Sequence, residues 1–204
     1  MVQHIAEENQ SWDSFVLLLV DVQRDFWTEE IAEAFPDYEN RVTELLAYCR
    51  QAALDVVHLR AGFQADQSDW MVKYRFLDSI PCLEGTEGAE VLPFATELPG
   101  EAVFVKNTFD GFLQAELQSY LQKHRKQFVL VAGIETSVCV LLTAASAAQR
   151  GYLVAVVEDC CADQRKAHEH TLDRYPFVFS RTTVDRIDAS REQWLADLEK
   201  LAKG

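Results

Sequence analysis

The chain has 204 residues, of which 49% are hydrophobic, 8 are glycine and 5 are proline. This composition is typical of one well-buried domain and excludes collagen-like, repeat and low-complexity architectures. Acidic residues number 33 against 19 basic ones, which gives a formal net charge of −14. Because no basic run suited to phosphate groups is present, the sequence predicts binding neither to nucleic acid nor to an anionic membrane surface.

The N-terminus, MVQHIAEENQSWDS, is polar and acidic and lacks the apolar segment of a secretory signal. The longest apolar runs are far shorter than the roughly 20 residues that a membrane-spanning helix needs. The five cysteines are odd in number and irregular in spacing, which favours reduced thiols over a disulfide framework. We therefore expect a cytoplasmic protein with a single domain over residues 1–204, in which residues 1–13 are an N-terminal extension.

Short apolar runs alternate with amphipathic helical patterns along most of the chain. This alternation predicts βαβ units and the α/β class. The expected architecture is a three-layer αβα, Rossmann-like fold, in which a six-stranded parallel sheet carries helices on both faces. The predicted strands are residues 15–20, 55–59, 102–105, 128–132, 153–157 and 177–179.

Two of the predicted helices have recognisable ends. Residues 136–150 are predicted to form a helix closed by Gly151, and residues 190–203 a terminal helix that Ser190 caps. Residues 60–100, by contrast, lack clear periodicity. Since long loops are commonly functional or mobile, we expect this segment to wall a pocket.

A carboxylate, a lysine and a thiol follow three of the predicted strands. In an open parallel sheet, ligands bind at the carboxyl ends of the strands. Asp21 follows the first strand, Lys106 the third, and the turn from Gly133 to Cys139 the fourth. A helix N-terminus and a nearby lysine are expected to lower the pKa of the Cys139 thiol, and desolvation to raise that of the Asp21 carboxyl. The three groups, with turn amides to receive an oxyanion, predict acyl transfer.

Three segments carry a family resemblance: LLLVDVQRDF, VFVKNTFDGF and VAGIETSVCVLLTAASAAQRGY, which begin at residues 17, 103 and 131. Together they resemble the isochorismatase-like cysteine hydrolase superfamily, which includes nicotinamidases, N-carbamoylsarcosine amidases and ureido-group hydrolases. The resemblance extends from about residue 16 to 187. It implies a homodimer or homotetramer that acts on a small-molecule substrate.

The resemblance also implies the site. Asp21 is the base, Lys106 its electrostatic partner and Cys139 the nucleophile of an Asp–Lys–Cys triad. A cis peptide bond is expected between Ile134 and Glu135, and an oxyanion hole from the backbone N–H groups of Glu135 and Cys139. The implied reaction is hydrolysis of a C–N bond in a small amide or ureido compound through a thioester.

Nicotinamidases of this family bind a metal through an Asp-x-His pair after the second strand and a further histidine downstream. The matching stretch here, VVHLRAGFQADQSDW, contains no such pair. We therefore predict no catalytic metal and no cofactor, and nicotinamide becomes a less suitable substrate. His58 in this stretch is interpreted as a residue that packs at the end of the strand or supports the residues of the site from behind.

Several side chains are weaker candidates for substrate contacts, because each is also typical of an ordinary core, loop or ion-pair residue. The segment KNTFDGF departs from the small neutral residues that often follow the family's lysine, which makes pocket shape harder to predict. The candidate substrate-binding residues are Gln23, Phe26, Arg60, Trp70, Phe109 and Phe112.

Three alternatives remain. A vinyl ether hydrolase of the isochorismatase type is one, although members with that activity generally lack the cysteine. A non-catalytic interaction protein is the second, and would leave the triad unexplained. A thiol-redox protein is the third; it lacks a CxxC motif, so Cys160 or Cys161 would have to resolve Cys139 in space.

Overall fold

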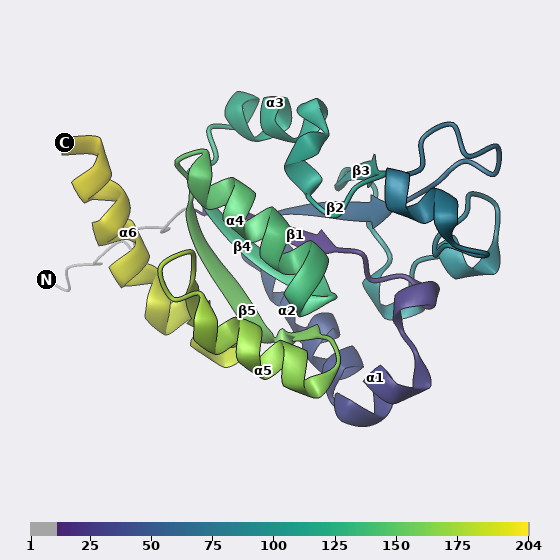
Figure 1. The fold of residues 1–204 in the computed structure, drawn as a ribbon. Helices are drawn as coiled ribbons and strands as arrows, with labels where there is room; N and C mark the ends of the chain where they lie inside the picture. Colours follow the sequence, from purple (N-terminus) through teal and green to yellow (C-terminus); the bar gives the residue numbers. More distant parts are fainter. Residues whose placement is uncertain (1–11, 204) are drawn as a thin grey trace, which may run out of the picture.

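The computed structural model describes residues 12–203. Its centre is a sheet of six parallel strands in the order β3-β2-β1-β4-β5-β6 (Figure 1). The strand order reverses between β1 and β4, as in doubly wound folds. The predicted fold class is therefore confirmed. The strands are β1 (Phe15–Val20), β2 (Asp55–Ala61), β3 (Ala102–Lys106), β4 (Phe128–Ile134), β5 (Leu153–Ala162) and β6 (Ser180–Thr182).

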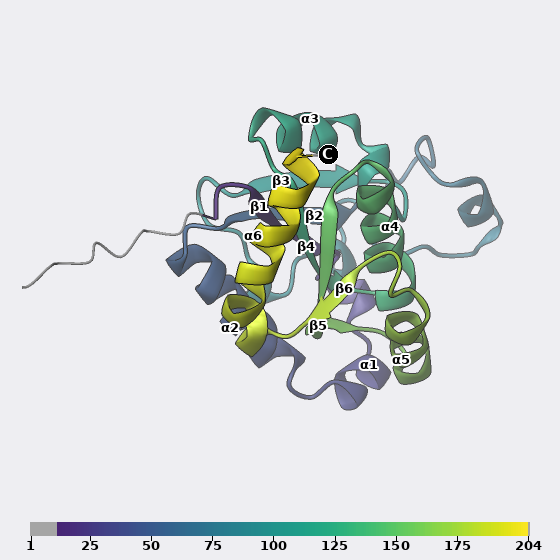
Figure 2. The same cartoon turned by 90° about the vertical axis from the view of Figure 1, so that its left-hand side faces the viewer.

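Helices cover both faces of the sheet. Helices α2 and α6 lie on one face, and α3, α4 and α5 lie on the other (Figure 2). Short 3-10 helices occupy several of the connections. The α-helices are α1 (Glu29–Ala34), α2 (Tyr38–Gln51), α3 (Ala115–Lys123), α4 (Leu141–Gln149), α5 (Arg165–Arg174) and α6 (Ile187–Lys203).

The core follows from the continuous apolar runs of the two central strands. Every residue of β1 and β4 is buried, as expected for strands covered on both faces. Trp194 of α6 packs on Phe128, with ring centroids 4.8 Å apart, and Trp12 packs on Phe15 at the same separation. Of the predicted extension at residues 1–13, residues 1–11 lie outside the described part of the chain, but Trp12 belongs to the core.

Strands β2, β3 and β4 extend beyond their predicted ranges at the carboxyl end. Main-chain pairing continues to Ala61, Lys106 and Ile134 in β2, β3 and β4. Pairing of this kind does not require apolar side chains, so the hydrophobic pattern alone places the strand ends too early. The predicted helix over residues 136–150 begins with a π-helical turn, η6 (Thr136–Val140), before α4.

The predictions for the last strand and the last helix are wrong in position. Phe177 is 77% exposed, and the edge strand β6 begins only at Ser180, where polar residues suit an edge. Helix α6 begins at Ile187, which is fully buried, so Ser190 lies inside the helix and does not cap it. Pairing with β5 sets the position of β6, and burial of Ile187 sets the start of α6, so the local sequence signal misplaces both elements.

Three consecutive residues after β1 fasten the segment of residues 60–100. The Gln23 amide accepts from the Ala61 N–H and donates to the carbonyls of Ala61 and Ala89. The Asp25 carboxylate accepts from the Cys82 N–H at 2.7 Å, and the Arg24 N–H donates to a carbonyl of the same segment. We call residues 23–25 the anchor segment. They hold the predicted loop, which contains the 3-10 helices η2 (Val72–Phe76), η3 (Glu87–Ala89) and η4 (Pro93–Ala95).

Between residues 12 and 203, no helix has the length and apolar character that a membrane crossing requires.

Candidate active site

The structure brings the three predicted catalytic side chains together. Asp21 follows β1, Lys106 ends β3, and Cys139 lies in the π-helical turn after β4. Lys106 reaches across the end of β2, and its Nζ lies 2.6 Å from Asp21 Oδ2 and 3.6 Å from Cys139 Sγ. It also donates to the Thr108 carbonyl at 2.9 Å. Asp21, Lys106 and Cys139 are 0%, 1% and 6% exposed, so the cluster is almost free of solvent.

Burial and mutual charge set the protonation of this cluster. Burial raises the pKa of the Asp21 carboxyl, although the charge of Lys106 partly offsets this effect. Burial disfavours the ammonium of Lys106, but the attraction of Asp21 and Cys139 keeps its pKa above the usual value. The ammonium is therefore retained next to a buried carboxylate.

The prediction that the Cys139 pKa is lowered is wrong. Burial of the sulfur and the negative charge of Asp21 raise it, and they outweigh the attraction of Lys106. The resting group is therefore a thiol. A base must remove its proton during the reaction, and Asp21 is the adjacent base.

Close packing shapes the turn that carries the thiol. Gly133 has φ +133°, and a Cβ at this position would lie 1.9 Å from the Val20 carbonyl oxygen, so only glycine fits. The peptide bond between Ile134 and Glu135 is cis. The glycine lets β4 approach the end of β1. We call residues 133–140 the nucleophile turn.

Polar contacts from the neighbouring connection hold the nucleophile turn. The Ser137 N–H donates to Asp163 Oδ2 at 2.7 Å. The Thr136 hydroxyl lies 2.9 Å from Nδ1 of His168, on α5. Burial lowers the pKa of His168, which favours the neutral imidazole. Sequence reasoning missed these supports, because Asp163 and α5 follow β5 and lie near the turn only when β4 and β5 pair in the sheet.

Three of the predicted substrate contacts are engaged elsewhere. The amide oxygen and nitrogen of Gln23 form hydrogen bonds with main-chain atoms of Ala61 and Ala89. Arg60 forms an ion pair with Glu97. Phe112 is 3% exposed and packs against Tyr152, with Arg150 over its ring at 5.1 Å. The structure thus gives these three residues packing and anchoring contacts.

The remaining predicted aromatic residues surround a second apolar cluster. Phe26 and Trp70 pack against this cluster, which comprises Ala61, Phe63, Ile80 and Cys82. The Trp70 indole N–H donates to the Gln64 carbonyl, and Phe109 meets Tyr74 edge to face at 6.1 Å. The aromatic wall, as we call these rings, comes from η1 (Arg24–Phe26), the segment of residues 60–100 and the loop after β3, and comprises Phe26, Phe63, Trp70, Tyr74 and Phe109.

Tyr74 is a site residue that sequence reasoning missed. It lies on η2, and its ring contacts both Phe63 and Phe109. Burial, and then the electrostatic interactions with Cys139 and Glu135, raise the pKa of its phenol to about 12. The phenol is therefore a neutral hydrogen-bonding group. No periodicity in MVKYRFL distinguishes Tyr74 from its neighbours.

A partly buried ion pair supports β2 at the amino end of β3, the end opposite to Lys106. Arg50 binds both carboxylate oxygens of Glu101, at 2.8 and 3.0 Å, and His58 Nε2 lies 2.9 Å from the same carboxylate. Burial disfavours the charge on Glu101, but hydrogen bonds from Arg50, the Leu98 amide and His58 lower its pKa to about 2. His58, 3% exposed, is therefore a buried residue that helps to hold the Glu101 carboxylate.

We expect Glu101→Gln to reduce the free energy of unfolding by about 2 kcal/mol at pH 7, because Arg50 loses its charged partner. The pKa of Glu101 in the folded protein lies below the usual value of 4.5. The difference from wild type should therefore be complete above pH 4.5 and shrink as the pH falls toward 2. Urea titrations at pH 7, 4 and 3 measure it. Glu44→Gln, in an exposed pair with Arg41, is the control and should change the free energy of unfolding by less than about 0.5 kcal/mol. A difference between wild type and Glu101→Gln that grew as the pH fell would contradict the lowered pKa of Glu101.

The other thiols give no sign of a second catalytic cysteine. All five cysteines are free and buried. Cys49 lies in the core face of α2, and Cys160 and Cys161 lie in β5.

Within residues 12–203, no group of three or more His, Cys, Asp or Glu side chains is arranged to hold a metal ion.

The family is established by comparison with known sequences. The isochorismatase domain model matches residues 15–189. The chain therefore belongs to the isochorismatase family, and it is a hydrolase of that family.

Named relatives cover most of the chain. Nicotinamidase 3 of Arabidopsis thaliana is 26% identical over 80% of this chain and 81% of its own. The maleamate amidohydrolase of Pseudomonas putida is 27% identical, over 76% of each chain. Among solved structures, an isochorismatase family protein from Desulfovibrio vulgaris has a TM-score of 0.80 and 26% identity, and covers 88% of this chain and 98% of its own.

Proposed function

We propose that this protein is a cysteine hydrolase that cleaves a C–N bond of a small amide or ureido substrate through a thioester. The observation that carries the proposal is the buried contact of Lys106 Nζ with both Asp21 Oδ2 and Cys139 Sγ. Relatives named as a nicotinamidase and a maleamate amidohydrolase support the choice of an amide bond.

The first half-reaction uses the two oxygens of Asp21 differently. Oδ2 is held by Lys106, whereas the buried Oδ1 has no hydrogen-bond partner among the described residues. Oδ1 is therefore available to take the Cys139 proton as sulfur attacks the substrate carbonyl. Lys106 stabilises both negative groups during this transfer, because its ammonium contacts each of them.

Collapse of the tetrahedral intermediate completes acylation. The backbone N–H groups of Glu135 and Cys139 receive the oxyanion in this proposal. The C–N bond breaks, and Asp21 returns its proton to the leaving nitrogen, which departs as ammonia or an amine. A thioester on Cys139 remains.

The second half-reaction regenerates the thiol. Asp21 removes a proton from water, and the resulting hydroxide attacks the thioester carbonyl. The C–S bond breaks, and the sulfur recovers the proton from Asp21. An amide substrate yields a carboxylic acid, and a ureido substrate yields a carbamate that decomposes to carbon dioxide and an amine.

The covalent intermediate provides the direct test. The wild-type protein is incubated with a panel of primary amides and ureido acids, ammonia release is recorded, and the reaction is quenched in acid during turnover. We expect the Cys139 peptide to gain the mass of the substrate's acyl group. A chelator arm tests the prediction of no metal. Ammonia release without an adduct on Cys139, with Asp21→Asn equally active, would rule out the triad mechanism.

A further inference from the structure

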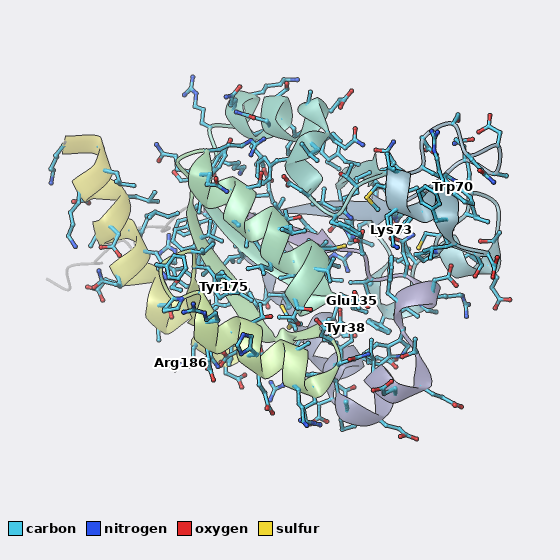
Figure 3. The ribbon with its side chains drawn as sticks, viewed as in Figure 1. Tyr38, Trp70, Lys73, Glu135, Tyr175 and Arg186 are labelled. Atoms are coloured by element: carbon cyan, nitrogen blue, oxygen red, sulfur yellow. The ribbon has the colours of Figure 1, made fainter. Side chains whose placement is uncertain are left out.

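The carboxylate of Glu135 is a charged group that the proposed mechanism does not use. Glu135 is the first residue after β4, directly before the π-helical turn of Cys139 (Figure 3). Only its backbone N–H enters the oxyanion hole, and its carbonyl accepts from the Val138 and Val140 N–H groups. The side chain is half-buried, and no residue between 12 and 203 donates to its carboxylate or pairs with it.

Other acidic groups near the turn already have partners. Asp21 is paired with Lys106. Asp163 accepts from the Ser137 and Gln164 N–H groups, one on each carboxylate oxygen. Glu135 is therefore different from both of its acidic neighbours, since its hydrogen-bonding capacity is unused in the ligand-free protein.

The surroundings of Glu135 disfavour its negative charge. Burial, and then the charges of Asp163 and Asp21, raise the pKa of its carboxyl. Glu135 lies four residues before Cys139, directly before the turn that carries the thiol, and its charge contributes to the raised pKa values of Cys139 and Tyr74. A ligand that brought a positive charge or an N–H donor to this carboxylate would relieve the unfavourable interaction.

The cations near the site offer little to a ligand carboxylate. Lys106 is buried and engaged by Asp21 and the Thr108 carbonyl, and Arg60 is paired with Glu97. Lys73, on η2, is exposed and lies on the side of the aromatic wall in Figure 3. The formal net charge of −14 also favours the approach of a cation over that of an anion.

We propose that Glu135 determines specificity: its carboxylate selects substrates that carry a cationic or N–H-donating group close to the scissile carbonyl, and it disfavours substrates with a carboxylate there. This inference rests on the proposed function and narrows its substrate class to amino-substituted amides and ureas. It assigns to the side chain of Glu135 a role separate from that of its backbone N–H.

The charge selection can be measured at Cys139 without any substrate. Methanethiosulfonates that carry a trimethylammonium or a sulfonate group transfer the same length of chain to a thiol, forming a disulfide and releasing methanesulfinate. The rate of mass gain at the Cys139 peptide is recorded for each reagent and divided by its rate with free mercaptoethanol. Cys139→Ala supplies the background from the other thiols.

We expect the normalised ratio of cationic to anionic rates to exceed one in the wild type and to fall about tenfold or more in Glu135→Gln, which keeps the shape and removes the charge. Glu116→Gln on the outer face of α3 is the matched control and should leave the ratio unchanged. Lys73→Ala should also leave it unchanged. An unchanged ratio in Glu135→Gln, or a ratio that responds to Lys73→Ala instead, would overturn the inference.

Turnover then separates this inference from the proposed function. Three amides of equal length are compared, ending in an amino group, a methyl group and a carboxylate, with the methyl compound as the internal reference. We expect kcat/KM to favour the amino compound in the wild type and this preference to vanish in Glu135→Gln. Turnover with the same preference in both proteins overturns the role of Glu135 and leaves the hydrolase in place. No turnover of any amide, with charge selection at Cys139 intact, contradicts the hydrolase and supports the selecting carboxylate.

Discussion

Replacing Cys139 by alanine should reduce ammonia release by a factor of about 10⁴ or more, because no other group near the carbonyl can form the covalent intermediate. Asp21 and Lys106 remain in the variant, so any residual rate measures catalysis by a directly attacking water. The fold should persist, since the substitution removes a single sulfur atom whose contact with Lys106 Nζ is long, at 3.6 Å.

A second buried thiol provides the matched control for this experiment. Cys49 is fully buried in α2 and lies outside the site. Cys49→Ala should cost some stability through lost packing and leave turnover unchanged. Equal activity of Cys139→Ala and wild type would remove the nucleophile from the mechanism, whereas equal losses in the two variants would point to a general effect on folding.

Replacing Lys106 by methionine should lower the free energy of unfolding by about 3–5 kcal/mol, because Asp21 then remains buried without a counter-charge. Turnover should fall at least about 10³-fold. The attraction of Lys106 holds the Asp21 pKa down. Its removal should raise that pKa further, so the acid limb of any residual activity should move to higher pH. Denaturant unfolding and a pH–rate profile measure the two effects.

The double variant Asp21→Asn with Lys106→Met separates stability from catalysis. Removing both charges leaves no unpaired ion, so the double variant should be more stable than Lys106→Met alone. It should remain inactive, since the base is gone. If the two stability losses simply added, the 2.6 Å contact between the two side chains would not be the coupled pair that the structure describes.

The apolar pattern predicted the centre of the fold and failed at its edges. Continuous runs such as 15–20 and 128–132 are strands because both of their faces are covered. β6 was not predicted, because its residues are polar and form a strand only by pairing with β5. The strand was predicted instead at the nearby apolar residues 177–179, although Phe177 is exposed to solvent.

The triad could be predicted, but its electrostatics could not. Asp21, Lys106 and Cys139 each follow a strand and stand in quoted family segments, so their convergence follows from topology. The pKa direction of Cys139 depends on the depth of burial, which no local sequence feature reports. Tyr74 was missed for a related reason, because its place in the aromatic wall depends on how the segment of residues 60–100 folds back.

The anchor segment has a consequence for how this site can change. Gln23 and Asp25 bind main-chain atoms of Ala61, Ala89 and Cys82, and the Arg24 N–H also reaches a main-chain carbonyl. Such bonds do not depend on which side chains the fastened segment carries. The wall of the site can therefore exchange its side chains while its attachment to the catalytic strand stays the same, so new substrate preferences can arise by substitution without rebuilding the scaffold.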